Sequence, residues 1–381
     1  MDNNSKKIAN WPATLYLEGQ DQFRGWFNSS LITSIILKKT PSYKQVLSHG
    51  FVVDEEGKKM SKSLGNVIDP EDVIKKFGAD ILRLWVISSD FTKESKISEN
   101  ILLKVKESYQ KIRNSFRFIL GNLSVEKNLN NLEGEEEELG LLDYSILFKL
   151  NELINDCKAN YKKYNLNYVF NYLLKFCNDL SSSYFEINKD SLYCDHIESK
   201  QRRRIITTLK YLLSGLLEIT YPILPYLAEE VYQNTPKKFE FALSESICLA
   251  NFLQYNNFPH DIKEKLEVME EIFSLRQEVN QELEKVRRKK EIDSNSQAKA
   301  TIFLKEGNKI VNAEKTLIEK IFLVSEVTLI IDDKNVPTDQ EYLIKISRND
   351  KGKCLRCWNY RDLKVDNICL RCFDFINKEE L

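Results

Sequence analysis

The chain has 381 residues, with 56 lysines and arginines against 57 aspartates and glutamates. This balance excludes nucleic-acid binding through overall charge, so any RNA contact must come from local patches. No apolar run approaches the roughly 20 residues that span a bilayer, and the first residues lack the apolar core of a signal peptide. We therefore expect a cytoplasmic protein of several domains, with no membrane partner.

The first hundred residues alternate between strand and helix patterns. Strands are expected over 14–17 and 51–53, and a helix over 22–37. Asp69 and Pro70 then supply an N-cap and a first-turn proline, which predict a helix that leads into a helical junction through Trp85. We expect residues 1–100 to form part of an α/β sheet.

A lysine-rich pentapeptide, Lys-Met-Ser-Lys-Ser, occupies residues 59–63 between Gly57 and Gly65. The ammonium groups of Lys59 and Lys62 could close over a triphosphate, because lysine carries a compact charge on a flexible stem. Five residues alone do not distinguish this ATP site from a solvated surface turn.

From residue 101 the apolar residues recur every three or four positions, which is the period of amphipathic helices. Helices are expected over 101–120, 143–163, 167–187, 199–220 and 226–233. A polar stretch over 128–140 should be an exposed loop, and Pro222 and Pro225 interrupt the helical pattern. We expect residues 101–260 to form an α-helical bundle.

A small α/β domain is expected over 261–346. It comprises a charged helix over 263–291, a second helix over 310–322, and strands over 301–304, 327–331 and 342–346. The first helix ends in the basic run 287–290. These cations could contact RNA phosphates or simply offset the helix macrodipole, and the sequence leaves both readings open.

The last segment, 347–381, carries two C-x2-C knuckles separated by eleven residues. Their four thiolates, Cys354, Cys357, Cys369 and Cys372, match tetrahedral zinc with no open position, so the site should be structural. Zinc, at roughly 10–16 kcal/mol, would supply most of the folding free energy of this ribbon. A redox pair and accidental spacing are the alternatives. The other cysteines are expected to be buried structural thiols: Cys157, Cys177, Cys194 and Cys248.

Aromatic and basic residues surround the first knuckle. Trp358 lies close to Arg356 and Arg361. Rings interleaved with guanidinium groups are typical of single-stranded RNA recognition, but a tryptophan in so small a ribbon could equally form its core.

Together these motifs resemble the C-terminal portion of a bacterial-type isoleucyl-tRNA synthetase, a class I aminoacyl-tRNA synthetase. The segments that carry the resemblance are 15–27, 47–51, the pentapeptide 59–63, 78–85, 222–230 and the cysteine ribbon. The valyl and leucyl relatives share the lysine loop, whereas a ribbon after a helical domain favours isoleucine. The implied fold is the C-terminal part of a Rossmann-like catalytic domain, followed by the helical bundle, the small α/β domain and the zinc ribbon.

The resemblance also implies roles for individual residues. Glu18 would bind the isoleucyl-adenylate through the α-ammonium of its isoleucine part. Asp21 and Gln22 would lie beside the adenylate, and His49 would lie near its adenosine. A buried carboxylate would suit the role of Glu18. Lys59 and Lys62 would hold the triphosphate of ATP, which enters with magnesium as a substrate. Trp358, Arg356 and Arg361 would face an isoleucine tRNA. The complete enzyme is expected to be a monomer with no DNA partner.

The family's His-x-Gly-His motif is absent, since the three histidines are His49, His196 and His260. We therefore expect a C-terminal fragment that lacks the first half of the catalytic fold and the editing domain, and that does not activate isoleucine by itself. Half a parallel sheet should also expose an edge and apolar surface. The alternatives are a non-catalytic tRNA-binding module and one half of a split synthetase, with an N-terminal half as partner.

Overall fold

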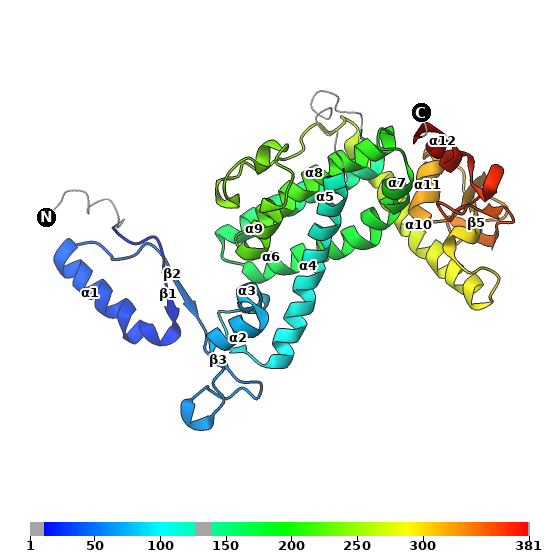
Figure 1. The fold of residues 1–381 in the computed structure, drawn as a ribbon. Coiled ribbons are helices and arrows are strands. Elements are labelled where there is room, and N and C mark those ends of the chain that lie inside the picture. Colours follow the sequence, from blue (N-terminus) through cyan, green and yellow to red (C-terminus); the bar gives the residue numbers. More distant parts are fainter. Residues whose placement is uncertain (1–10, 126–138, 380–381) are drawn as a thin grey trace. The chain divides into compact units, whose positions relative to one another are not determined.

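The computed structural model describes residues 11–125 and 139–379, so most of the loop expected over 128–140 lies outside the described residues. The chain divides into two compact units that interleave along the sequence (Figure 1). The first unit comprises residues up to 113, 157–174 and 220–227. The second comprises 114–156, 175–219 and 228 onwards. The four domains expected from the sequence, with three boundaries between them, stay a prediction.

The first unit begins with a β-α-β arrangement. Strand β1 (Tyr16–Gly19) is followed by helix α1 (Trp26–Lys38) and then by strand β2 (Val46–His49), which pairs with β1 in parallel. The Tyr16 ring stacks on that of Trp26, with centroids 4.1 Å apart, and this contact holds α1 against the sheet. The expected α/β pattern is therefore present, with the helix starting a few residues later than predicted.

The next elements are short. Strand β3 (Val52–Val53) pairs in parallel with β4 (Ser95–Lys96). Helix α2 (Pro70–Phe77) starts at its predicted cap, because the Asp69 carboxylate accepts the backbone N–H of Glu71 at 2.8 Å. Helix α3 (Ala79–Ser88) follows.

Apolar side chains remain uncovered in this part of the chain. Leu17 is 53% exposed, and Ile36 and Leu37 on α1 are 64% and 73% exposed. The β1–β2 sheet has only two strands, so its outer edges have no strand partner among the described residues. This agrees with the apolar surface expected for half a sheet.

The middle of the chain is helical, as expected. Its helices are α4 (Glu99–Val125), α5 (Leu141–Lys162), α6 (Leu166–Leu180), α7 (Glu186–Cys194), α8 (Lys200–Thr220) and α9 (Pro225–Gln233). The helix predicted over 167–187 differs from the structure, because a π-helical turn over Ser181–Phe185 separates α6 from α7. Pro225 stands at the first position of α9, where its missing N–H costs nothing.

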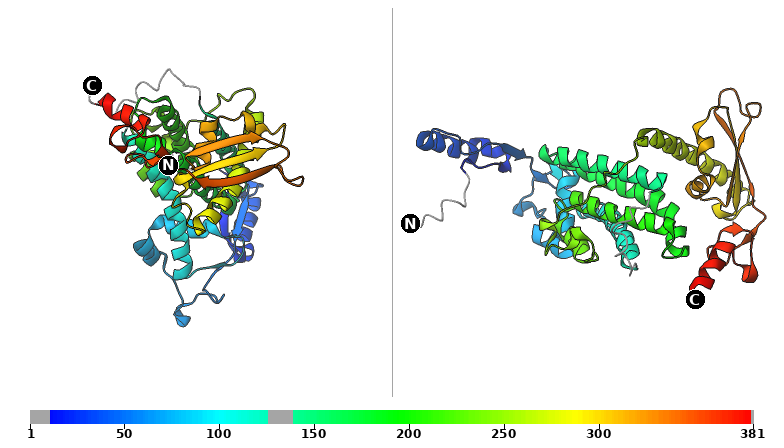
Figure 2. Two further views of the ribbon diagram at one scale, coloured as in Figure 1. Left: turned by 90° about the vertical axis from the view of Figure 1, so that its right-hand side faces the viewer. Right: turned by 90° about the horizontal axis from the view of Figure 1, so that it is seen from above.

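The second unit ends in a small α/β domain and a ribbon. The domain comprises α10 (Ile262–Arg288), β5 (Ala298–Leu304), α11 (Lys315–Phe322), β6 (Glu326–Ile331) and β7 (Tyr342–Arg348). Figure 2 shows the three long strands side by side; β5 is central, parallel to β6 and antiparallel to β7. The ribbon comprises β8 (Gly352–Lys353), β9 (Tyr360–Arg361) and α12 (Leu370–Glu379).

The four scattered cysteines differ in how far they are buried. Cys157 and Cys177 are buried and Cys194 is half-buried, but Cys248 is exposed, so the prediction of a buried thiol is wrong there. It lies in a short 3-10 turn (Ile247–Leu249) that buries Ile247 instead.

At the basic end of α10, Arg287 and Arg288 pair with Glu284 at 3.0 and 3.3 Å. These ion pairs within the helix support a role in stabilising its C-terminal end.

Among residues 11–125 and 139–379, no helix is long and apolar enough to cross a membrane.

Candidate functional site

The lysine loop, residues 57–65, is held by side chains at both of its ends. Asp54 Oδ1 accepts the N–H of Lys58 at 2.7 Å, and its Oδ2 accepts the Asn66 amide at 2.8 Å. The Asn66 amide oxygen in turn accepts the N–H of Ser61 at 2.9 Å. The hydrogen bond from Asn66, followed by that from the Lys58 backbone, lowers the pKa of Asp54. The loop backbone is therefore fixed although its side chains face solvent.

The two lysines of this loop are exposed. The ammonium of Lys59 lies 5.2 Å from the centre of the Phe51 ring, and Lys62 begins a 3-10 turn that ends at Gly65. Gly65 has φ +68°, which glycine adopts without strain. Neither lysine forms an ion pair with any described residue, so both charges are available to an anion.

The residues expected around an adenylate gather where β1 and β2 end. Gly19 pairs with His49, and a Cβ on Gly19 would lie 2.8 Å from Asp21 Oδ1 and 3.7 Å from His49 Cε1. A side chain at position 19 would therefore force the Asp21 carboxylate to move. Gln22 has a structural task as well, because its amide oxygen accepts the Trp26 N–H at 2.9 Å at the start of α1.

Glu18 departs from expectation. Its carboxylate is exposed rather than buried, and its Oε2 accepts only the neighbouring Gly19 N–H at 3.3 Å. The reason is that β1 pairs with β2 on one side only and is uncovered on the other. The described chain therefore does not supply the burial that would suit its expected role, and the role itself stays a prediction.

The four cysteines of the two knuckles come together in the ribbon. Their sulfurs lie within 4.8 Å of one another, and Cys357 Sγ is 3.8 Å from Cys369 Sγ. Zinc bonds of about 2.3 Å in a tetrahedron separate sulfurs by about 3.8 Å, so this arrangement fits the ion. Burial raises the pKa of Cys354, but N–H donors from Cys357, Cys369 and Arg356 outweigh it and lower this pKa to about 6. The site favours a thiolate there.

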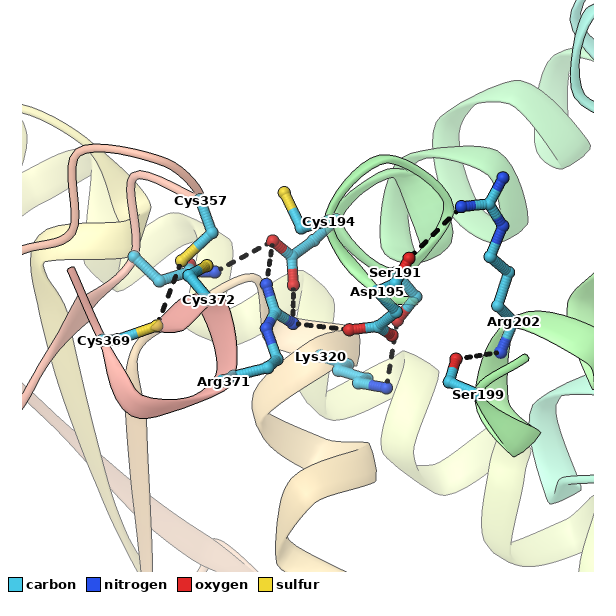
Figure 3. A network of polar contacts seen from close by, with 12 residues as sticks. Ser191, Cys194, Asp195, Ser199, Arg202, Lys320, Cys357, Cys369, Arg371 and Cys372 are labelled. Atoms are coloured by element: carbon cyan, nitrogen blue, oxygen red, sulfur yellow. Dashed lines mark hydrogen bonds and ion pairs between the residues drawn. The ribbon is translucent and has the colours of Figure 1, made fainter. Parts of the chain in front are cut away.

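Charged side chains join the ribbon to the end of α7 (Figure 3). Arg371 binds Asp190 with both terminal nitrogens, at 2.6 and 2.9 Å, and lies 3.4 Å from Asp195. Asn359 adds a hydrogen bond to Asp190 at 3.2 Å. No sequence signal could have indicated this cluster, because Arg371 and Asp190 are 181 residues apart.

The three residues expected to face RNA differ in what they contact. Trp358 is 68% exposed and adopts φ +61°, with the Lys353 ammonium 5.9 Å from its ring. It therefore does not form the core of the ribbon. Arg361 is also exposed. Arg356 instead donates to the Cys194 carbonyl at 2.7 Å and stacks 3.9 Å from the Phe375 ring, which gives it a structural role.

Two family models match the chain. Residues 1–98 match class I tRNA synthetases for isoleucine, leucine, methionine and valine (I, L, M and V), and residues 143–302 match the anticodon-binding domain of tRNA ligases. The chain is therefore similar to class I tRNA synthetases over both of these segments.

Within this class, the similarity is to isoleucine–tRNA ligases. The enzyme of Malacoplasma penetrans is 42% identical over 97% of the chain, and that of Caldicellulosiruptor bescii is 38% identical over 98%. The chain spans only 40% and 41% of the lengths of these relatives, which is consistent with a C-terminal portion.

Solved structures show the same fold at low sequence identity. The LeuRS of Agrobacterium radiobacter, in a ternary complex with tRNA and LeuAMS, has a TM-score of 0.51 at 16% identity and covers 79% of this chain and 31% of its own. The methionyl-tRNA synthetase of Mycobacterium tuberculosis, bound to methionyl-adenylate, has a TM-score of 0.50 at 18% identity, covering 66% and 50%.

Proposed function

We propose that this chain forms the C-terminal part of an isoleucine–tRNA ligase. The ligase would activate isoleucine with ATP and transfer it to an isoleucine tRNA in the cytoplasm. The observation that carries the proposal is the similarity to isoleucine–tRNA ligases over nearly the whole chain, together with two unpaired lysines on a fixed loop.

In this proposal Lys59 and Lys62 bind the triphosphate of magnesium-bound ATP and offset the charge that develops as pyrophosphate leaves. Their exposure and the lack of an ion partner within the described chain support this role. Asp21, Gln22 and His49, gathered at the ends of β1 and β2, would border the adenylate, and Glu18 would bind the α-ammonium of isoleucine. Positioning and electrostatic stabilisation would supply most of the rate enhancement.

The ribbon would hold one structural zinc ion on Cys354, Cys357, Cys369 and Cys372, since four thiolate ligands leave no open position for catalysis. We further propose that exposed Trp358 stacks on an unpaired base of the tRNA, with Arg361 near its phosphates. Arg356 would support this surface from beneath rather than contact RNA, because its guanidinium is already bonded.

The test is isoleucine-dependent exchange of pyrophosphate into ATP, measured on the full-length protein that carries this sequence. Lys62→Ala should lower kcat by about 100- to 1,000-fold, the loss typical of removing one preorganised charge donor. The KM for isoleucine should change little, since the lysine acts on phosphate.

Lys58→Ala is the matched control. Lys58 is the neighbour of Lys59, but its ammonium is paired with Glu56 at 2.7 Å, so its loss should leave exchange unchanged. A Lys62→Ala defect confined to isoleucine binding, or exchange that depends on leucine or valine rather than isoleucine, would contradict the proposal.

A further inference from the structure

The second unit contains a cavity of 340 Å³ that belongs neither to the lysine loop nor to the cysteine site. Side chains from the first turn of α5 and from α7, α8, α10 and α11 line it. Four of its lining residues are cations and two are acids. The cations are Arg204, Lys265, Lys309 and Lys320, and the acids are Asp143 and Glu314.

Two of the cations have acidic partners outside the cavity lining. Lys265 pairs with Asp261 at 3.2 Å, and Lys309 pairs with Glu267 at 2.9 Å. The two lining cations that remain to be accounted for are therefore Arg204 and Lys320.

Lys320 and Arg204 lie near acids but leave hydrogen-bond donors unsatisfied within the described chain. Burial lowers the pKa of Lys320, and the charges of Asp195, Asp190 and Asp143 oppose this effect. Among the described residues, the Lys320 ammonium donates one long hydrogen bond, 3.4 Å, to Ser191 Oγ (Figure 3). The Nε–H of Arg204 is buried and has no hydrogen-bond partner among the described residues. A buried donor without a partner is unfavourable, so a ligand that supplies acceptor oxygens would stabilise both groups.

Asp143 attracts both cations by its charge, but the hydrogen bonds described for its carboxylate come from other groups. One oxygen accepts the Tyr184 hydroxyl at 2.5 Å and the other accepts the Gly140 N–H at 3.0 Å. Burial raises the pKa of Asp143, and hydrogen bonds from Tyr184 and Gly140 together with the charge of Arg204 oppose this rise.

We propose that this cavity binds a small phosphate-bearing anion, held by the Arg204 guanidinium and the Lys320 ammonium. A phosphate presents several acceptor oxygens to a guanidinium and an ammonium at once, which satisfies both donors. A volume of 340 Å³ accepts inorganic phosphate or the phosphate end of a mononucleotide. The site is independent of the function proposed above.

The experiment compares thermal unfolding of the zinc-loaded full chain in potassium phosphate with unfolding in potassium chloride at equal ionic strength. We expect about 3 °C of stabilisation by phosphate, because an anion that binds only the folded state raises Tm. Titration calorimetry with inorganic phosphate should show at least tenfold weaker binding for Lys320→Gln and for Arg204→Gln.

The variants also separate a binding role from a structural one. If Lys320 serves an anion, Lys320→Gln should keep its Tm in chloride, since a buried charge is removed, and should lose the gain in phosphate. If Lys320 only offsets the charges of Asp190 and Asp195, the Tm of Lys320→Gln should fall equally in both salts, and this result would overturn the proposal. The loss of phosphate binding in Lys62→Ala measures any phosphate that binds at the lysine loop instead of the cavity. Lys334→Gln removes an exposed charge and is the surface control.

Two further results decide the remaining cases. Should Arg204→Gln fail to fold, Arg204→Lys retains the charge but loses the Nε–H, and it should bind phosphate more weakly than the wild type. Equal binding by the wild type and all cavity variants would overturn the proposal, as would no saturable binding of phosphate at millimolar concentrations. Tight binding of a mononucleotide rather than phosphate would identify the source of the phosphate group.

Discussion

At the scale of single residues, Gly215 on α8 lies against side chains of α5 with no room for a side chain of its own. A Cβ at this position would lie 2.9 Å from Ile154 Cδ1 and 3.0 Å from Leu150 Cδ2. We predict that Gly215→Val lowers the free energy of unfolding by about 1–3 kcal/mol, because its two methyl groups overpack a filled contact. Urea unfolding of the zinc-loaded chain measures the loss.

Gly121→Val is the matched control, since Gly121 also lies within a long helix but its Cβ would meet nothing within 4 Å. Its stability should remain within about 0.5 kcal/mol of the wild type or rise, because valine is a better helix former than glycine. Equal losses from both substitutions would mean that helix propensity, not packing, dominates at Gly215.

The sequence predicted those site residues whose chemistry depends on spacing along the chain. The four cysteines are an example, because two C-x2-C knuckles fix the ligand type and number before any fold is known. The partners of Arg371 could not be predicted, since its contact with Asp190 depends on where α7 ends in space. The exposure of Glu18 was missed for a similar reason, because burial depends on which strands flank β1.

At the scale of elements, α3 caps another helix. The Asp80 carboxylate accepts the N–H of Leu227 at 2.7 Å in the first turn of α9, and Arg83 donates to the carbonyls of Pro222 and Ile223 at 3.0 and 3.1 Å. Asp80→Ala should therefore cost about 1–2 kcal/mol, the usual value of a lost helix cap. Thermal unfolding at neutral pH measures this change.

Burial raises the pKa of Asp80 above 3.8, so the folded chain holds this proton more tightly than the unfolded chain. The part of the stability that comes from this tighter proton binding is therefore lost as pH rises from about 3.8 through the folded pKa, while the cap hydrogen bond remains. Asp80→Asn keeps an acceptor oxygen but does not titrate. Across this window, its stability relative to the wild type should increase with pH; a constant or falling difference would contradict the assignment.

Helix positions followed from periodicity and caps, as at α2, where Asp69 and Pro70 mark the start. Strand pairing did not follow, because the pattern of β5 alone does not indicate a parallel neighbour on one side and an antiparallel neighbour on the other. The division between α6 and α7 was also missed, since the π-helical turn keeps helical backbone angles and leaves the apolar spacing almost unchanged.

At the scale of the whole molecule, the ribbon depends on its cysteine cluster for a core. Its buried cluster comprises Cys354, Cys369 and Cys372, with only Cys357, Leu363 and Ile368 packed against it. So few apolar groups cannot offset the entropy of ordering the segment. Zinc removal should therefore unfold the ribbon, and the freshly prepared, reduced chain should contain one zinc ion.

Hydrogen exchange of the chain before and after chelation tests this prediction. Protection should be lost over residues 352–372 and reduced at Asp190 and Asp195, because Arg371 leaves them when the ribbon unfolds. Arg371→Ala in the zinc-loaded chain is the control, since it should weaken protection at the end of α7 while the ribbon stays folded. A ribbon that remains protected without metal would show that its other contacts suffice, and zinc would then not determine how this end of the chain folds.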